Sequence, residues 1–146
     1  MIYPETVVIS FMKRMETELG SDYALDLPGI DFDSVAQAEW LEARDLGYTP
    51  RPSRDGEKVD LWTFQVNCYD RGPTMWRIIE MVDDVDATWN QHDLAVRNWD
   101  EIGDPVVGWL RCEQTTAVAV PASGARATRT ADLSQVAVTI RGSYIE

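Results

Sequence analysis

His92 is the residue best suited to proton transfer, and it is the single histidine of the chain. A histidine that activates a nucleophile needs a serine, threonine or cysteine within hydrogen-bond reach of its imidazole. His92 is followed by Asp93, but no cysteine lies near it and no local pattern supplies a nucleophile. We therefore interpret His92 as a surface residue.

Clustered carboxylates are the second candidate for chemistry, because aspartates on one face can bind a metal ion. Asp83, Asp84 and Asp86 fall within a helical pattern, where side chains one and two positions apart point in different directions. The acidic stretch over residues 21–33 lacks the glycine and the bidentate glutamate spacing of an EF-hand loop. Both groups are predicted to be solvated acid, so no metal site is expected.

Phosphate and thiol chemistry are also without support. Gly103 and Gly124 lack the spacing and the lysine of a phosphate-binding loop. Cys68 and Cys112 lie in strand-like runs without metal-ligand spacing, where a thiol serves as a small buried hydrophobe. The sequence therefore predicts no catalytic residue and no cofactor, and we expect that the protein is not an enzyme.

The net charge limits the partners of the chain. With 13 Lys and Arg against 25 Asp and Glu, the formal charge is -12 over 146 residues. Such an excess of acid disfavours duplex DNA binding, which needs a basic face, and docking on an anionic membrane. No apolar run reaches the roughly 18 residues of a membrane span, and the N-terminus lacks a signal-peptide pattern. We expect one domain over residues 1–146, made in a cytosol.

The elements that must position these residues are clearest over residues 59–89. Apolar side chains alternate with polar ones at Trp62, Phe64, Val66 and Cys68, which predicts a half-buried strand. The period then changes to three and four, which predicts an amphipathic helix that begins at Pro73 or Thr74 and ends near Trp89. The residues predicted to form its buried stripe are Met75, Trp76, Ile78, Ile79, Val82 and Val85.

A first helix is predicted over residues 4–19. Val7 or Val8, Phe11, Met15 and Leu19 share one face, and Gly20 suits the helix end. Residues 34–47 leave two alternatives open. Ser34 with Gln37 resembles a capping box and favours a helix, whereas a strand over residues 38–46 would form a long-tipped hairpin with the strand at 59–69.

The C-terminal part predicts two more strands. Residues 90–104 are polar and end in a turn at Gly103-Asp104-Pro105, and residues 105–119 are apolar and β-branched. Residues 133–140 alternate, with Val136, Val138 and Ile140 inward. The predicted fold is therefore α+β, with an antiparallel or mixed sheet of about four strands with long hairpins, packed by two α-helices.

Surface remains that is suited to protein partners. Six aromatic residues cannot all fit inside one small core, namely Tyr3, Trp40, Tyr48, Trp89, Trp99 and Tyr144. Two hairpin tips, residues 47–58 and 119–132, carry arginines in an otherwise acidic chain. The candidate contacts to other subunits or to a tube are Arg51, Arg54, Arg126 and Arg129, and loops without a partner are the alternative.

The layout resembles the tail terminator, or tail completion, proteins of long-tailed bacteriophages over nearly the full length. The resemblance is one of element pattern and not of a strict motif. The pieces that carry it are the helix over residues 4–19, Glu39-Trp40-Leu41-Glu42-Ala43, Leu61-Trp62-Thr63-Phe64-Gln65-Val66-Asn67-Cys68-Tyr69-Asp70-Arg71, Gly72-Pro73-Thr74, the strand over 107–115 and the final strand over 131–140.

The resemblance implies a structural virion protein, without catalytic residues, that is assembled in the host cytoplasm and lies at the head-proximal end of the tail. Such proteins form a six-fold ring that caps the tail tube, stops its polymerisation and meets the head-side connector. The implied partners are copies of this chain, the tail tube protein and a connector or stopper protein. DNA would pass through the lumen without sequence-specific binding. The resemblance also favours the hairpin alternative for residues 34–47.

Two alternatives remain open at the level of the sequence. One is another head-to-tail connector component, a stopper or an adaptor. The other is an α+β enzyme or binding protein, in which Trp62, Trp76 and Trp109 line an apolar cavity for a small ligand.

Overall fold

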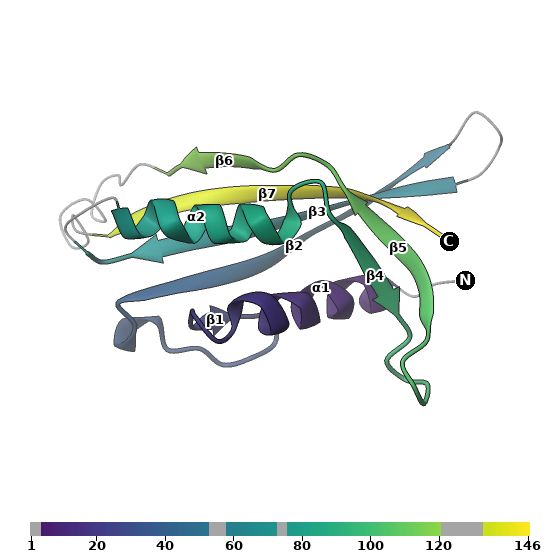
Figure 1. Cartoon of the computed structure of the whole chain (residues 1–146), viewed down its shortest axis with the longest axis horizontal. Coiled ribbons are helices and arrows are strands. Elements are labelled where there is room, and N and C mark those ends of the chain that lie inside the picture. The colour runs from purple at the N-terminus through teal and green to yellow at the C-terminus, as the bar shows by residue number, and fades with distance from the viewer. Residues whose placement is uncertain (1–3, 53–57, 73–75, 121–132) are drawn as a thin grey trace.

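The computed structural model describes residues 4–52, 58–72, 76–120 and 133–146. This part of the chain forms two α-helices, a short 3₁₀ turn and seven strands (Figure 1). In chain order they are α1 (Pro4–Leu19), β1 (Leu25–Asp26), η1 (Ser34–Ala36), β2 (Glu39–Pro52), β3 (Lys58–Asp70), α2 (Trp76–Trp89), β4 (Asp93–Arg97), β5 (Val106–Cys112), β6 (Thr116–Ala119) and β7 (Ser134–Ile145).

The strands form one curled sheet in the order β1-β2-β3-β7-β5-β4. β3 is its central strand, paired antiparallel with β2 on one side and with β7 on the other. On the side away from β3, β7 pairs with two strands: β6 pairs with residues 136–139 and β5 pairs with residues 142–145. The two-residue strand β1 pairs parallel with β2, so the sheet is mixed.

The predicted α+β class with two helices is confirmed, but the predicted number of about four strands is wrong. The apolar run over residues 105–119 forms two strands, β5 and β6, separated by residues 113–115. β4 lies in a segment that the sequence predicted to be a polar connection. The strand was missed because only two of its residues, Leu94 and Val96, face the core. β1 is too short to leave a periodic pattern.

The helix α1 has the predicted bounds, Pro4–Leu19. Val7, Phe11, Met15 and Leu19 are almost fully buried, as the spacing predicted. The buried hydroxyl of Ser10 accepts hydrogen bonds from the Arg97 backbone N–H at 3.2 Å and from Trp99 Nε1 at 3.1 Å. These bonds fasten the helix to β4 and the loop after it. No helix in the described residues is long and apolar enough to span a bilayer.

Residues 34–47 follow the hairpin alternative. Only the single turn η1 is helical, and it is capped by Asp33, whose side chain accepts a hydrogen bond from the Val35 N–H, and not by Ser34. β2 then begins at Glu39 and pairs with β3. Pairing along a full-length neighbouring strand therefore outweighs the local helix signal.

The core is built around a stack of aromatic rings on the helix-facing side of the sheet. The ring of Phe11 lies between Phe64 and Trp89, with centroid distances of 4.0 and 4.2 Å and nearly parallel planes. Trp62 extends the stack beside Phe64. The stack joins α1, β3 and α2, and the predicted inward residues of β3 are all buried.

The orientation of α2 differs from the predicted one. Its buried face consists of Ile78, Met81, Val85, Thr88 and Trp89. Trp76 and Ile79, which the sequence assigned to the core stripe, are 75% and 47% exposed. The apolar residues of this helix cover more than one face, so spacing alone could not tell which face would meet the sheet. The predicted start at Pro73 or Thr74 lies outside the described residues.

A β-bulge interrupts the β2–β3 hairpin, and the arm at the tip of this hairpin projects beyond the sheet. The pairing register shifts between Asp45 and Tyr48, and Gly47 has a φ of 93°, which favours glycine. Beyond the bulge, Tyr48 stacks on Trp62 with centroids 4.7 Å apart. Because the pairing of β3 with β7 begins at Asp60, the strands beyond that residue extend past the sheet (Figure 1).

Substituting Phe11→Ala tests the aromatic stack. Truncating a fully buried phenylalanine costs about 3–5 kcal/mol, because apolar burial is lost and a cavity remains. We expect this loss in the free energy of unfolding, measured by urea denaturation. Ile102→Ala is the matched control, since Ile102 is fully exposed and its truncation should change the free energy by no more than about 0.5 kcal/mol. A loss below about 1 kcal/mol for Phe11→Ala would contradict the role of the stack.

Candidate functional site

The acidic and basic residues that the sequence singled out do not converge on one site. His92 is exposed in the turn between α2 and β4. Asp84 accepts a hydrogen bond from the Tyr23 hydroxyl, and Asp86 accepts one from the Thr115 hydroxyl, so the two carboxylates serve different elements. Within the described residues, no group of three or more His, Cys, Asp or Glu side chains could hold a metal ion.

The two thiols are structural, as the sequence predicted. Cys68 and Cys112 are both buried and free. Burial raises the pKa of each thiol to about 12, because the core disfavours the charged thiolate. A thiol that stays protonated is a poor nucleophile, so neither cysteine is poised for chemistry.

Of the four candidate arginines, the structure describes only the backbone of Arg51. Arg51 lies on β2, and its backbone pairs with Val59 across the projecting arm. Arg54, Arg126 and Arg129 lie outside the described residues. The contacts predicted for these four side chains therefore remain a prediction.

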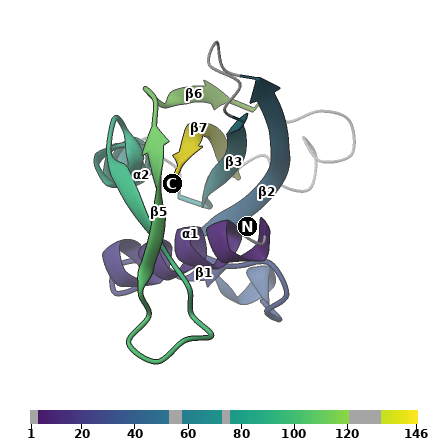
Figure 2. The same cartoon turned by 90° about the vertical axis from the view of Figure 1, so that its right-hand side faces the viewer.

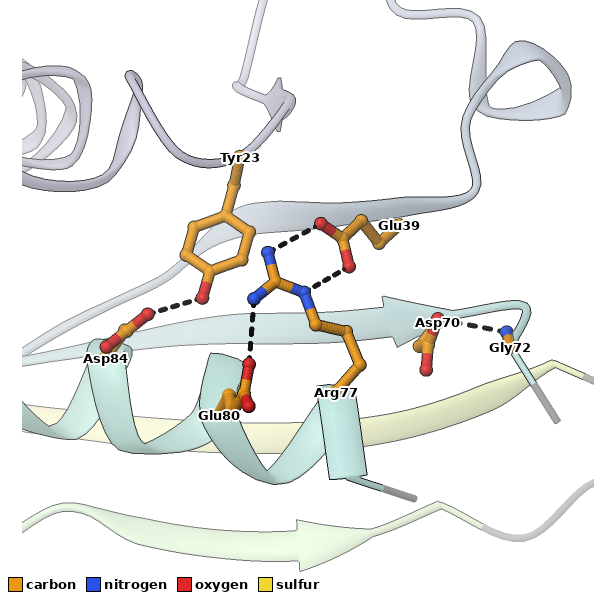
Figure 3. Close-up of polar contacts among 7 residues, drawn as sticks. All are labelled: Tyr23, Glu39, Asp70, Gly72, Arg77, Glu80 and Asp84. Atoms are coloured by element: carbon orange, nitrogen blue, oxygen red, sulfur yellow. Dashed lines mark hydrogen bonds and ion pairs between the residues drawn. The ribbon is translucent and has the colours of Figure 1, made fainter. Parts of the chain in front are cut away.

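A polar cluster fixes α2 against β2 and against the loop that follows α1 (Figure 3). Arg77 donates to both carboxylate oxygens of Glu39, from Nε at 2.6 Å and from Nη2 at 2.7 Å. Its Nη1 donates to Glu80 at 3.0 Å, and its guanidinium lies 5.0 Å from the ring centroid of Tyr23. The Tyr23 hydroxyl in turn donates to Asp84, as the dashed line in Figure 3 shows.

This cluster shifts the pKa values of its members and adds a polar contact to the apolar face by which α2 packs on the sheet. The hydrogen bonds from Arg77 hold the pKa of Glu39 below its usual range. Burial, followed by the hydrogen bond to Asp84, raises the pKa of Tyr23. Arg77 reaches Glu39 on β2, whereas its neighbour Trp76 is exposed to solvent.

The exposed aromatic residues differ in part from the predicted ones. Trp89, Trp40 and Tyr144 are buried, Tyr48 is 45% exposed, and Tyr3 lies outside the described residues. Sequence reasoning missed Trp109 as a surface residue, although it is 48% exposed. A signal was present, because Gly108, Leu110 and Cys112 form the buried phase of β5 and Trp109 falls in the opposite phase.

The tryptophans of the ligand-pocket alternative do not share a cavity. Trp62 is buried in the aromatic stack, whereas Trp76 and Trp109 face solvent on different elements. A hollow of about 530 Å³ lies elsewhere, between the loop after β1 and the edge of β2, and it is open to solvent. Asp26 lines this hollow, and burial followed by the nearby Glu42 carboxylate raises its pKa.

Comparisons with known proteins find likeness in structure and not in sequence. A scan against protein-family models and a search of curated proteins both find no match for this chain. A solved structure that carries no functional description is 15% identical with a TM-score of 0.64, and the alignment covers 100% of this chain and 98% of that chain. A chain described as "Virion of native gene transfer agent (GTA) particle" is 10% identical with a TM-score of 0.61, over 94% of this chain and 93% of that chain.

At these identities the comparisons show the fold alone. Both alignments extend over nearly the whole of each chain, so the complete arrangement of elements is shared and not one motif within it. One of the two solved chains described above belongs to a phage-like particle, which agrees in general terms with the resemblance noted in the sequence.

Substituting Glu39→Gln tests the polar cluster through its pH dependence. A glutamate with a lowered pKa in the folded state contributes stability above its unfolded pKa of about 4.3 and loses that contribution as the pH falls through the folded value. We expect the variant to be about 1 kcal/mol less stable at neutral pH, since the pair is partly exposed and water screens it.

The difference from wild type should shrink as the pH falls from about 5 toward 3, in urea unfolding at a series of pH values. Glu18→Gln is the control, because Glu18 is exposed on α1 and has no ion pair within the described residues. A difference for Glu39→Gln that is independent of pH would contradict the assigned pairing.

Proposed function

We propose that this protein is a structural component of a phage-like particle, and more specifically a subunit of the ring that terminates a tail tube. The observation that carries the proposal is the shared fold with a chain of the gene transfer agent virion, over more than nine-tenths of both chains. The element pattern of the sequence, which resembles tail terminator proteins, supports the same conclusion independently of that comparison.

The geometry suits a subunit that makes contacts beyond its own core. The arm of the β2–β3 hairpin extends past the sheet, and its strands carry Arg51 near the tip. Two tryptophans face solvent at separate places on the surface. An exposed tryptophan supplies rigid apolar contact area with a polar handle, which suits it to contact with another protein.

In the proposed assembly, copies of this chain form a ring, six-fold by the resemblance, on the end of the tail tube. The ring stops tube polymerisation and presents a surface to the head-side connector. The acid excess of the chain lines the pore, so that passing DNA is repelled from the wall and does not adhere to it. A neutral or basic lumen in the assembled ring would contradict this part of the proposal.

The first test is whether the protein forms rings with its tube partner. The purified chain, alone and mixed with tail tube protein, is examined by negative-stain microscopy and by size measurement. We expect rings at the ends of tubes, and tubes of limited length when the chain is present. Tubes that grow without limit in its presence, with bare ends, would contradict the proposal.

The second test concerns the four arginines. Changing Arg51, Arg54, Arg126 and Arg129 to glutamate should leave the monomer folded but block ring or tail assembly, because each positive contact becomes repulsive. The matched control changes the same four residues to lysine, which retains the charge and should preserve assembly. Circular dichroism checks folding, and microscopy counts completed particles. Intact particles from the glutamate variant would refute the assigned contacts.

A further inference from the structure

Two apolar surfaces remain exposed and are not covered by the other residues that the structure describes. The helix patch is the exposed stripe of α2 formed by Trp76, Ile79, Glu80 and Asp83, which share one face at spacings of three and four. Trp76 is the most exposed aromatic residue of the described chain. The patch thus presents a large indole and an isoleucine, followed along the helix by two carboxylates.

The second surface lies on the opposite face of the sheet. The sheet patch consists of Val107 and Trp109 on β5, and Ile145, which pairs directly with Trp109 across the strands. They are 39%, 48% and 41% exposed. Arg111 follows Trp109 on the same face of β5, and Arg141 lies on that face of β7. This patch therefore presents apolar side chains followed by two guanidinium groups.

The sheet patch is held rigidly by the residues beneath it. The ring of Tyr144 fills the space over Gly108, where an added Cβ would collide with the tyrosine hydroxyl oxygen. That hydroxyl donates to the Val107 carbonyl at 3.2 Å. The helix patch is likewise fixed, because Arg77 joins α2 to Glu39 on β2. Neither surface requires an ordering step before it can bind.

The charges that border the two patches are complementary. Asp83 is exposed and makes no ion pair within the described residues. Glu80 is bound to Arg77 at 3.0 Å but remains 64% exposed. On the other patch, Arg141 makes no ion pair in the described part of the chain, and Arg111 contacts Asp93 only at 3.5 Å with both side chains largely exposed. Such an exposed ion pair stabilises the fold by less than about 1 kcal/mol, so Arg111 can leave Asp93 and pair with a carboxylate of another copy.

The patches also lie far apart on the molecule. In Figure 1, α2 begins at the left end of the long axis, whereas the β4–β5 hairpin and the C-terminus lie at the right end. Figure 2, viewed from that right-hand side, shows β5 and the C-terminus at the front with α2 behind. A contact between two different patches at opposite ends is heterologous, so it propagates from copy to copy and closes into a ring if the rotation permits.

We infer that the helix patch of one copy of this chain binds the sheet patch of the next. Trp76 and Ile79 pack against Val107, Trp109 and Ile145, while Asp83 and Glu80 meet Arg111 and Arg141. This contact rests on the proposed function, for which it supplies the subunit-to-subunit interface. It is distinct from the contacts proposed for Arg51, Arg54, Arg126 and Arg129, which belong to other segments of the chain.

The test uses two variants, Trp76→Glu and Trp109→Glu, each of which removes one patch and leaves the other intact. Both positions face solvent, so circular dichroism should show both variants folded. In sedimentation velocity at rising concentration, wild type should associate and each variant alone should associate on the order of thirtyfold more weakly, as expected for a tryptophan central to a contact. Ile102→Glu is the control, since Ile102 is exposed outside both patches and this variant should associate like wild type.

Mixing the two variants gives the decisive result. Their remaining patches are complementary, so an equimolar mixture should form a 1:1 dimer and nothing larger. A mixture that stays monomeric, variants that associate like wild type, or a wild type that never associates would each overturn the inference. If one of these results is found but the chain still forms rings on tail tubes, the inferred contact is wrong and the proposed function stands. If the wild-type chain also forms no ring with tube protein, both the inferred contact and the proposed function are wrong.

Discussion

The fold depends on the stacking of Phe11 between Phe64 and Trp89. These three rings come from α1, the central strand β3 and the last turn of α2, so one contact fixes both helices to the sheet. Nearly parallel rings at about 4 Å bury large apolar areas with little freedom to slide. With the C-terminal end of α2 held by Trp89, the Arg77–Glu39 pair joins the other end of the helix to β2.

The sequence could predict those elements whose pattern is set by burial alone. In α1 the apolar residues at helical spacing are buried, and in β3 the apolar residues at alternate positions are buried. The bounds and inward faces of these two elements therefore follow from the spacing. β4 and β1 could not be predicted, because a short edge strand buries only one or two residues and leaves no periodic signal. For residues 34–47 local reasoning left helix and strand open, because the helical signal there supports only one turn and tertiary pairing decides the rest.

The candidate site was less predictable for a different reason. Arginine at the hairpin tips is visible in the sequence, but an exposed apolar residue resembles a core residue until its neighbours are known. Trp76 and Ile79 extend the apolar pattern of α2, but they lie outside the face by which the helix packs on the sheet. Trp109 is more instructive, because its phase within β5 already separates it from Leu110 and Cys112.

The acidity of the chain and its two apolar patches act on different length scales, and this difference bears on how assembly is controlled. Copies with a formal charge of -12 repel one another, although salt screens this repulsion beyond about 8 Å under physiological conditions. Apolar burial acts only at contact, and one tryptophan contributes a few kcal/mol at about 25 cal/mol per Å². A single contact of this size is close to the cost of association.

On our proposal, the last subunit of a closed ring makes two contacts at once, and a tube end raises the effective concentration of neighbours. The same surface would therefore associate free copies only weakly and at high concentration, and hold them firmly where a closed ring can form on the end of a tube.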